Sequence, residues 1–180
     1  GQDYPLLKPK AKEKGYTIYE CGADVGSHFL SFNQNSKDGI KRSWFRTLGF
    51  REAVNCAIDR DSMVEIVYNR SALRQCSPLS PAIPFFFNPD IPCPGFDPAR
   101  SSQLLDEAGF RDTDADGILE DGNGNPLEFI LSTNSENPER MEIASMIRAD
   151  LSRIGMKVNL LPLEFNSLVV KLLASGDWDA

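Results

Sequence analysis

Residues 127–163 carry the pattern of a β-strand, an α-helix and a second β-strand joined by short connections. Apolar residues alternate over Leu127–Thr133 and over Met156–Leu163, which is the period of a strand. Between them, apolar residues recur at helical spacing over Glu139–Ile154, and Gly155 follows as a helix stop. Strands joined in this way normally lie side by side in parallel after a right-handed crossover. This unit predicts an α/β fold with a small mixed sheet flanked by helices.

A second helical pattern begins at Phe50. Its apolar residues recur at i, i+4, i+7 and i+8 and form one buried stripe: Phe50, Val54, Ala57 and Ile58. Either Asp59 or Asp61 is expected to be the N-cap of a further helix that begins near Ser62 and continues through Tyr68. Two helices are therefore expected almost without a loop between them.

The remaining elements follow from turn residues and caps. Asp97 and Pro98 are typical of a helix start, and Gly109 of the residue after its end. Short strands are expected at 16–19 and 28–33, a polar loop at 35–43 with a helical pattern from Trp44 or Phe45, a long proline-rich loop at 71–98, and a last helix at 165–174 with Leu168, Val169, Leu172 and Leu173 buried.

Composition and charge restrict the partners of the chain. The 180 residues contain 19 basic and 26 acidic side chains, a net charge of -7, and no basic cluster. Nucleic acid is excluded as a partner because phosphate neutralisation needs a positive face, and an electrostatic grip on anionic membranes is disfavoured for the same reason. A hydrophobic content of 41% is typical of an ordinary globular domain.

The N-terminal residues differ in character from the rest. Residues 1–15 are polar, rich in lysine and contain two prolines, so we expect them to be a connector, with residues 16–180 forming a single α/β lobe. They lack the apolar segment of a signal peptide, so either a signal has been removed or the chain is an internal piece.

The four cysteines allow two interpretations. Cys76 and Cys93 bracket the proline-rich loop and could close it, which fits an oxidising setting and would add about 3 kcal/mol by the chain-entropy model. Four reduced thiols are the alternative. Cys56 accompanies the buried stripe and behaves as a small hydrophobe, and no Cys-x-x-Cys pair indicates zinc.

Catalytic chemistry has little support. His28 is the only histidine, which excludes a multi-histidine metal site and favours a structural or surface role for this residue. A carboxylate-based hydrolase could still use Asp59 with Asp61, or Asp112 with Asp114. These pairs are also explained as helix caps and turn residues, so a non-enzymatic protein is predicted.

The stretch 112–121 resembles the first half of an EF-hand calcium loop. Asp112, Asp114 and Asp116 stand at alternate positions, Gly117 allows the sharp bend, and the carbonyl of Ile118 follows as a fourth oxygen. Hard oxygen ligands suit a calcium ion, which would also relieve the repulsion among the carboxylates.

The second half of the loop departs from that pattern. Its twelfth position holds Asn123 instead of a bidentate glutamate, and Glu120 or Asp121 would have to substitute. The alternative is a solvated, aspartate-rich turn that bonds its own backbone. No cofactor is required on either interpretation, and structural calcium is the one metal hypothesis. A calcium-stabilised interaction module is therefore an alternative function.

Phe85, Phe86 and Phe87 lie in the proline-rich loop and supply an apolar anchor. Packing against the core is the favoured interpretation, and a groove for peptides is the alternative.

Several consecutive blocks carry a resemblance to a known family. They are Phe-Arg-Glu-Ala-Val-Asn-Cys-Ala-Ile-Asp-Arg at 50–60, the prolines from Pro78 to Pro84, Gly-Phe-Asp-Pro-Ala-Arg at 95–100 and Leu-Leu-Asp-Glu-Ala-Gly-Phe at 104–110. In order and spacing they resemble the oligopeptide- and dipeptide-binding proteins of bacterial ABC importers, extracellular solute-binding protein family 5, from about Phe29 onward.

The resemblance implies one lobe of a periplasmic-binding-protein type II-like fold. Such proteins hold a peptide or related small solute between two lobes by hinge closure and pass it to the importer's membrane permease, outside the cytoplasm. It implies a second lobe as partner and places Asn33, Gln34 and the loop after Cys76 nearest the cleft. The family's ammonium-binding aspartate follows the stretch at 176–180, so one lobe alone is expected to bind peptide poorly.

Overall fold

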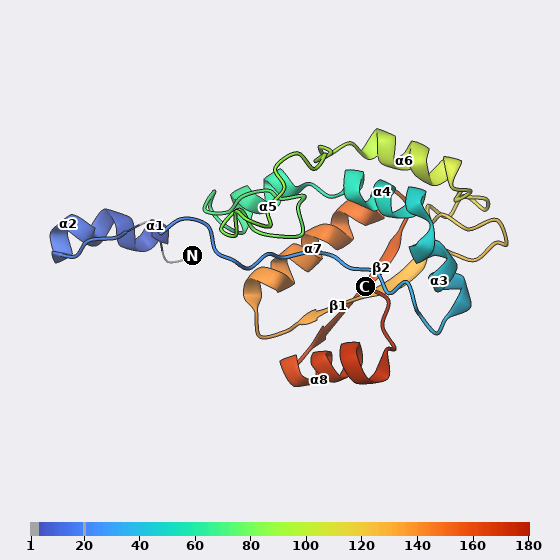
Figure 1. The fold of residues 1–180 in the computed structure, drawn as a ribbon. Coiled ribbons are helices and arrows are strands. Elements are labelled where there is room, and N and C mark those ends of the chain that lie inside the picture. Colours follow the sequence, from blue (N-terminus) through green and yellow to red (C-terminus); the bar gives the residue numbers. More distant parts are fainter. Residues whose placement is uncertain (1–3, 20) are drawn as a thin grey trace. The chain divides into compact units, whose positions relative to one another are not determined.

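The computed structural model of the chain describes residues 4–19 and 21–180 (Figure 1). Its helices and strands are α1 (Tyr4–Leu7), the 3₁₀ helix η1 (Lys8–Lys10), α2 (Ala11–Lys14), α3 (Gly39–Arg46), α4 (Leu48–Ala57), α5 (Arg60–Ile66), α6 (Pro98–Glu107), β1 (Glu128–Asn134), α7 (Pro138–Ser152), β2 (Lys157–Leu163), α8 (Phe165–Val170) and the π-helix η2 (Lys171–Ser175). The chain divides into two units. The first comprises Gly1–Phe29 with Arg60–Cys93, and the second comprises Leu30–Asp59 with Pro94–Ala180.

The second unit is built on the predicted strand, helix and strand. β1 and β2 pair in parallel from Glu128 opposite Lys157 to Asn134 opposite Leu163, which confirms the predicted crossover. Isolated antiparallel bridges join Arg111 to Glu120 and Glu120 to Pro126. The α/β fold class is thus confirmed.

Local caps fix the ends of α7. Asn137 accepts a hydrogen bond from the backbone nitrogen of Arg140, and Pro138 occupies the first helical turn. Gly155 ends the following turn with a φ of +80°, and a Cβ atom there would lie 2.7 Å from Leu119 Cγ. Glycine is therefore required at this position both by the backbone conformation and by the close neighbour.

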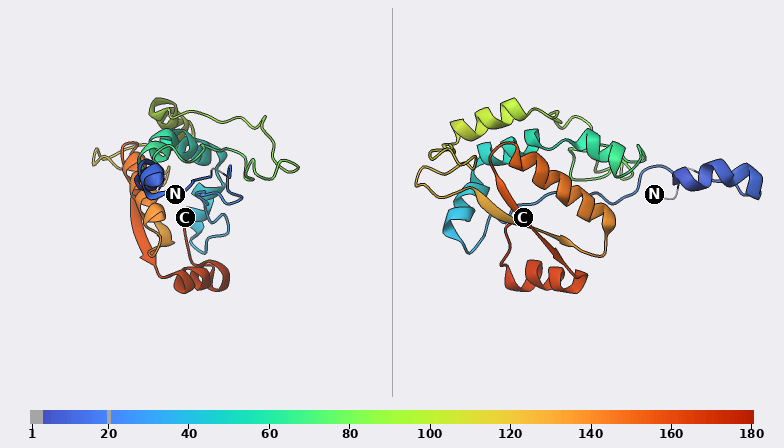
Figure 2. Two further views of the ribbon diagram at one scale, coloured as in Figure 1. Left: turned by 90° about the vertical axis from the view of Figure 1, so that its left-hand side faces the viewer. Right: turned by 180° about the vertical axis from the view of Figure 1, so that it is seen from behind.

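Helices surround the two strands within the second unit. Figure 1 shows α7 and α8 on opposite sides of β1 and β2, and α4 between α6 and α7; the view from behind in Figure 2 agrees. α6 begins at its predicted cap, because Asp97 accepts from the nitrogen of Arg100. The buried Ser101 hydroxyl donates to the carbonyl of Ala53 at 2.8 Å and joins α6 to α4.

A cluster of phenylalanines forms the centre of this core. The ring of Phe32 lies 5.0 Å from Phe45, 5.1 Å from Phe50 and 5.6 Å from Phe129, measured between centroids. The rings of Phe45, Phe50 and Phe129 are fully buried. Rings at these separations add packing energy beyond the apolar area that they remove from water.

The predictions of short strands at 16–19 and 28–33 were both wrong. Tyr16–Tyr19 forms no strand in the described part of the chain, because Tyr16 ends a helical turn: its nitrogen bonds to Ala11 and its hydroxyl donates to Leu7. Residues 28–33 form no strand either. Phe32 packs in the core without a strand partner, while Phe29 is 82% exposed.

Two helix boundaries and one buried position also differ from expectation. α3 starts at Gly39 inside the expected polar loop, because the Asp38 carboxylate accepts from the nitrogens of Ile40 and Lys41. α5 starts at Arg60, immediately after the first of the two expected caps, Asp59. Leu173 was expected to be buried but is 83% exposed, because the helix changes to π-type at Lys171 and its faces rotate.

The first unit contains α1, η1, α2, α5 and the proline-rich loop as far as Cys93. Short helical turns occupy residues 4–14, inside the expected connector. The division into a connector and a single lobe stays a prediction. Among the described residues, no helix combines the length and the apolar character needed to cross a bilayer.

Candidate functional site

Asn33 connects its own segment to the stretch 176–179. Its side-chain nitrogen donates to the carbonyls of Gly176 at 3.1 Å and Trp178 at 2.8 Å, and its backbone nitrogen donates to Asp179 at 2.8 Å. Its side-chain oxygen accepts from the nitrogen of Asn35. Asn33 is only 7% exposed, so both amide protons are used inside the protein.

Gln34, the second predicted ligand residue, is exposed. Its backbone carbonyl accepts a hydrogen bond from Arg46 Nε at 2.7 Å. Of the two predicted ligand residues, Asn33 is therefore buried and Gln34 is exposed. Their role in ligand binding stays a prediction.

Asp179 is the charged centre of the same junction. Its carboxylate lies 2.7 Å from Lys41 Nζ and also accepts from the backbone nitrogen of Ile130 at 2.9 Å. Ala180 next to it bonds the backbone of β1 at Ile130 and Ser132. We did not predict these contacts of Asp179 from the sequence. The only signal there is the pair of aspartates on either side of Trp178.

The aspartate-rich loop brings four of the six predicted calcium ligands together. One carboxyl oxygen from each of Asp112, Asp114, Asp116 and Glu120 lies within 4.8 Å of the others. The first three side chains are exposed and Glu120 is buried. This spread of oxygens is compatible with ligands arranged around one calcium ion.

The same carboxylates also bond the loop's own backbone. Asp112 accepts from the nitrogens of Ala115 at 2.7 Å and Gly117 at 3.0 Å, and Glu120 accepts from both the nitrogen and the hydroxyl of Thr113. These hydrogen bonds support the turn. Ile118, whose carbonyl is the fifth predicted ligand, donates from its backbone nitrogen to Asp116 Oδ1 at 2.7 Å. Calcium binding stays a prediction.

Asp121, the sixth predicted ligand, has other partners. Its carboxylate accepts from the indole nitrogen of Trp44 at 3.0 Å and from the side-chain and backbone nitrogens of Asn125 at 3.0 Å. Burial alone would raise the pKa of Asp121, but hydrogen bonds from Asn125, Trp44 and Asn123 outweigh it and hold the pKa below its ordinary value. Asp121 therefore fastens the loop to α3.

An open hollow of about 330 Å³ lies beside this contact, with Lys41, Trp44, Glu128 and Asn159 among its lining residues. The pKa of Glu128 is lowered because Asn159 and Lys157 hydrogen-bond its ionised form. Neither Asn33 nor Gln34 lines the hollow.

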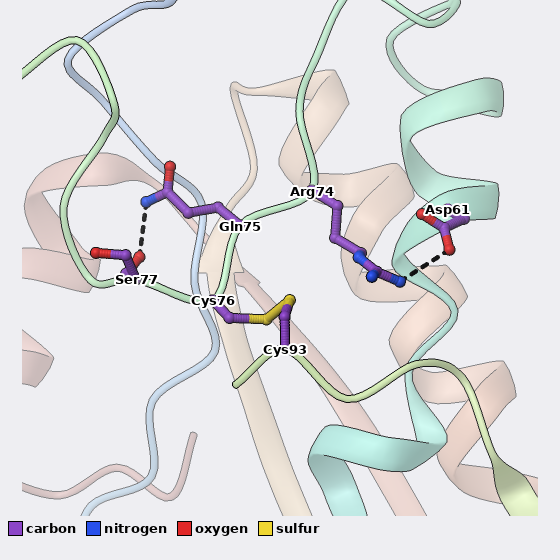
Figure 3. Close-up of a disulfide and its surroundings, with 6 residues drawn as sticks. All are labelled: Asp61, Arg74, Gln75, Cys76, Ser77 and Cys93. Atoms are coloured by element: carbon purple, nitrogen blue, oxygen red, sulfur yellow. Dashed lines mark hydrogen bonds and ion pairs between the residues drawn. A yellow bond between two sulfur atoms is a disulfide. The ribbon is translucent and has the colours of Figure 1, made fainter. Parts of the chain in front are cut away.

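The proline-rich loop of the first unit is closed by a disulfide between Cys76 and Cys93, whose Cα atoms are 5.3 Å apart (Figure 3). This confirms the bridged alternative, while Cys21 is free and exposed and Cys56 is free and buried. Beside the bridge, Gln75 donates to the carbonyl of Ser77, and the Arg74 guanidinium donates to the Asp61 carboxylate at 3.0 Å.

The expected packing of the three phenylalanines was wrong for two of them. Phe85 is 88% and Phe86 is 65% exposed, whereas Phe87 is half-buried. The rings of Phe85 and Phe86 contact each other edge to face, with centroids 4.8 Å apart. The loop thus displays an aromatic pair at the surface.

The residues considered for catalysis have structural partners. His28 is exposed and its ring lies 6.1 Å from that of Tyr68. Asp61 pairs with Arg74, and Asp112 is bonded to its own turn. These contacts favour structural roles for the candidate acids and bases.

Comparisons of this chain with known proteins agree on one family, that of bacterial solute-binding proteins. Residues 2–180 match the family described as bacterial extracellular solute-binding proteins, family 5 Middle. The chain is 30% identical over 167 residues to a probable ABC transporter-binding protein of Deinococcus radiodurans, covering 93% of this chain and 28% of that protein. It is 33% identical over 177 residues to the oligopeptide-binding protein AppA of Bacillus subtilis, and the match covers 97% of this chain and 31% of AppA.

A further relative carries a different name. Heme-binding protein A of Haemophilus influenzae is 29% identical over 164 residues, and the match covers 89% of this chain and 26% of that protein. Among solved structures, an oligopeptide-binding protein OppA superimposes with a TM-score of 0.85 at 29% identity, covering 99% of this chain and 28% of that one.

The chain spans less than a third of the length of these relatives. The likeness in fold confirms the expected periplasmic-binding-protein type II-like architecture. Because the family match extends over residues 2–180, the chain belongs to the bacterial extracellular solute-binding proteins of family 5.

Proposed function

We propose that this chain is part of an extracytoplasmic solute-binding protein that captures peptides and delivers them to the membrane permease of an ABC importer. The observation that carries the proposal is the family match over residues 2–180. The names of AppA and OppA, which are similar over nearly the whole chain, favour a peptide as the solute. The name of the Haemophilus relative makes heme the competing solute.

The shape of the described surface supports capture by two lobes. Two hollows of the described surface, of about 330 and 340 Å³, are open to solvent, and each lies at the lower end of the volumes that ligand pockets have. A peptide bound on such a surface would keep much of its area in water. A second lobe, supplied by the part of the relatives' length that these residues do not span, would cover the solute by hinge closure.

The role is non-catalytic. Its support is the structural use of the candidate acids and bases, since Asp61, Asp112 and Asp114 are each bonded to neighbouring groups. A solute-binding protein returns its ligand unchanged, whereas a carboxylate-based hydrolase would cleave it.

The natural protein that contains these residues tests both parts of the proposal. It is incubated with a mixed library of di- to nonapeptides and, separately, with heme, then freed of unbound molecules and denatured. We expect mass spectrometry of the released fraction to find intact peptides and no heme. Release of heme alone, or of cleaved peptides, would contradict the proposal.

A further inference from the structure

The chain turns sharply between Glu120 and Pro126, which pair in an antiparallel bridge, and we call the residues between them the hairpin tip. The nitrogen of Gly124 donates to the carbonyl of Asp121 at 2.9 Å, and the nitrogen of Asp121 donates to the carbonyl of Asn125 at 3.0 Å. This is the pattern of a three-residue loop that ends in a glycine bulge. Gly124 accordingly has a φ of +79°, which a residue with a Cβ atom adopts only under strain.

The glycine that this turn requires follows an asparagine. Asn123 and Gly124 are both exposed, and no other asparagine of the sequence precedes a glycine. An Asn-Gly pair is reactive, because a backbone nitrogen beside a residue without Cβ can approach the side-chain carbonyl carbon of the asparagine. A Cβ atom built on Gly124 would meet no heavy atom within 4 Å, so no neighbouring segment crowds this approach.

Two features distinguish Asn123 from Asn125, the other asparagine of the hairpin tip. Asn125 precedes Pro126, whose nitrogen carries no proton, and its side chain donates to the Asp121 carboxylate at 3.0 Å. Within the part of the chain that the structure describes, the side-chain amide of Asn123 has no hydrogen-bond partner, and only its backbone nitrogen is bonded. The amide of Asn123 is therefore free to turn toward the following nitrogen.

Serine, whose side chain is also small, follows three other asparagines of the chain. All three are held through their side chains by hydrogen bonds: Asn35, Asn134 and Asn166. A side chain held in this way must give up its hydrogen bond before it can turn toward the next backbone nitrogen. Asn123 thus combines the least hindered neighbour with an unrestrained amide.

The reaction that this pair allows is a ring closure followed by hydrolysis. The backbone nitrogen of Gly124 loses its proton and forms a bond to Cγ of Asn123 while the Cγ–Nδ2 bond breaks, and the side-chain nitrogen leaves as ammonia with that proton. Water then opens the five-membered imide. Opening at one carbonyl gives aspartate, and opening at the other gives isoaspartate, in which the main chain runs through the former side chain.

The closed turn limits the rate of this reaction. The attacking nitrogen of Gly124 is the one that donates to the carbonyl of Asp121, so this bond has to open first. The Asp121 carboxylate keeps the tip closed, since it accepts from the backbone nitrogens of Asn123 at 2.9 Å and Asn125 at 3.0 Å. An exposed turn opens locally at a small part of the free energy of global unfolding.

The isoaspartyl product would no longer fit the turn. It adds one carbon atom to the main chain between Asn123 and Gly124, so the spacing on which the bonds of the tip depend is lost. It also places a second negative charge two residues from Asp121, whose carboxylate accepts from the indole nitrogen of Trp44 in α3 at 3.0 Å. The product would therefore loosen both the tip and its attachment to α3.

We infer that Asn123 is a site of spontaneous deamidation through attack by the nitrogen of Gly124, that Asp121 sets the rate, and that the isoaspartyl product opens the hairpin tip. The inference goes beyond the proposed capture of a solute and does not depend on it. It gives the protein a slow change of charge and of main-chain length at one defined residue.

Peptide mapping of the natural protein that contains these residues provides the test. The protein is incubated in ¹⁸O-labelled water at neutral and at mildly alkaline pH, digested with pepsin and sequenced by mass spectrometry. Conversion during the incubation adds about 3 Da, because ¹⁸OH replaces the amide nitrogen and its protons. We expect Asn123 to convert at least about tenfold faster than Asn166, and faster at the higher pH, because Gly124 must lose a proton.

Three variants separate the role of the turn from that of the sequence. Asp121→Ala removes the acceptor that keeps the tip closed and should speed conversion about threefold or more. Asp114→Ala is the matched control, because it removes an exposed carboxylate that accepts from a backbone nitrogen of the preceding turn, and it should change the rate less than twofold. Asn123→Gln should not convert, because its longer side chain would have to close a six-membered ring.

The modified protein is separated by anion exchange and compared by hydrogen exchange. The amides of residues 119–126 should exchange at least about tenfold faster than in the parent, while those of α7 stay unchanged. Conversion of Asn123 only after unfolding in urea, equal rates at Asn123 and Asn166, equal effects of Asp121→Ala and Asp114→Ala, or unchanged exchange of residues 119–126 would each overturn the inference.

Discussion

Lys41 Nζ lies 2.7 Å from Asp179 Oδ2, and this ion pair joins α3 to a segment 138 residues further along the chain. Both side chains are largely buried, and the same carboxylate accepts from the backbone nitrogen of Ile130 in β1. Because the pair is shielded from water, its loss should cost more than the loss of a surface pair.

The change Asp179→Asn should lower the free energy of unfolding by about 1–3 kcal/mol, since it leaves Lys41 partly buried without its counter-charge. Glu107→Gln is the matched control, because the Arg100–Glu107 pair is 3.4 Å apart and exposed, and it should cost less than about 1 kcal/mol. Denaturant unfolding of both variants measures the difference. Equal losses would refute a special role for the Lys41–Asp179 pair.

Asn33 and Gln34 are predicted to respond differently to truncation. Asn33→Ala removes the donor to the two partly buried carbonyls of Gly176 and Trp178 and should lower the free energy of unfolding by about 1–3 kcal/mol. Gln34→Ala alters an exposed side chain and should stay within about 0.5 kcal/mol. If Asn33→Ala left stability unchanged but weakened solute binding in the natural protein, the ligand role would be favoured over the structural one.

The Asp121 carboxyl predicts a dependence of stability on pH. Its pKa in the folded chain lies below the ordinary value of about 3.9, so its contribution is complete above that value and is lost as the pH falls through the folded pKa. At neutral pH, Asp121→Asn should be less stable than the parent by about 1–2 kcal/mol. This difference should shrink as the pH falls below the ordinary value of about 3.9 and the carboxylate of the folded chain takes up its proton. A difference that is constant over the range would show that the carboxylate charge is not the cause.

The calcium hypothesis predicts a gain in thermal stability. For a dissociation constant of about 1 mM, 10 mM calcium would add about 1.4 kcal/mol and raise the Tm by about 3–5 °C. The change Asp114→Asn with Asp116→Asn should remove this gain, and magnesium at the same concentration should give less. An identical Tm in calcium and in chelator would leave the loop as an aspartate turn.

The sequence predicted best those features that short segments specify. The parallel strands, α6 with its Asp97 cap, and α7 with its Gly155 stop depend on period and local capping, which neighbouring residues determine. The bridge between Cys76 and Cys93 was one of two alternatives, because sequence alone does not set the redox state.

Features that depend on distant residues could not be predicted. Phe32 packs among Phe45, Phe50 and Phe129 without strand pairing, so the apolar residues at 28–33 were mistaken for a strand. The partners of Asn33 lie 143 and 145 residues away, and no periodicity reports such a contact. Asp121 was considered as a substitute calcium ligand from its place in the loop, and its contact with Trp44, 77 residues away, could not be read from that pattern.

Isothermal titration with a mixed peptide library tests the central claim most directly. The natural protein that contains these residues should bind peptide with a dissociation constant of about 10 μM or tighter, because two lobes together can bury most of the solute. Residues 1–180 alone should bind more weakly than about 1 mM. Micromolar binding by residues 1–180 alone, or no binding by the natural protein, would contradict capture between two lobes.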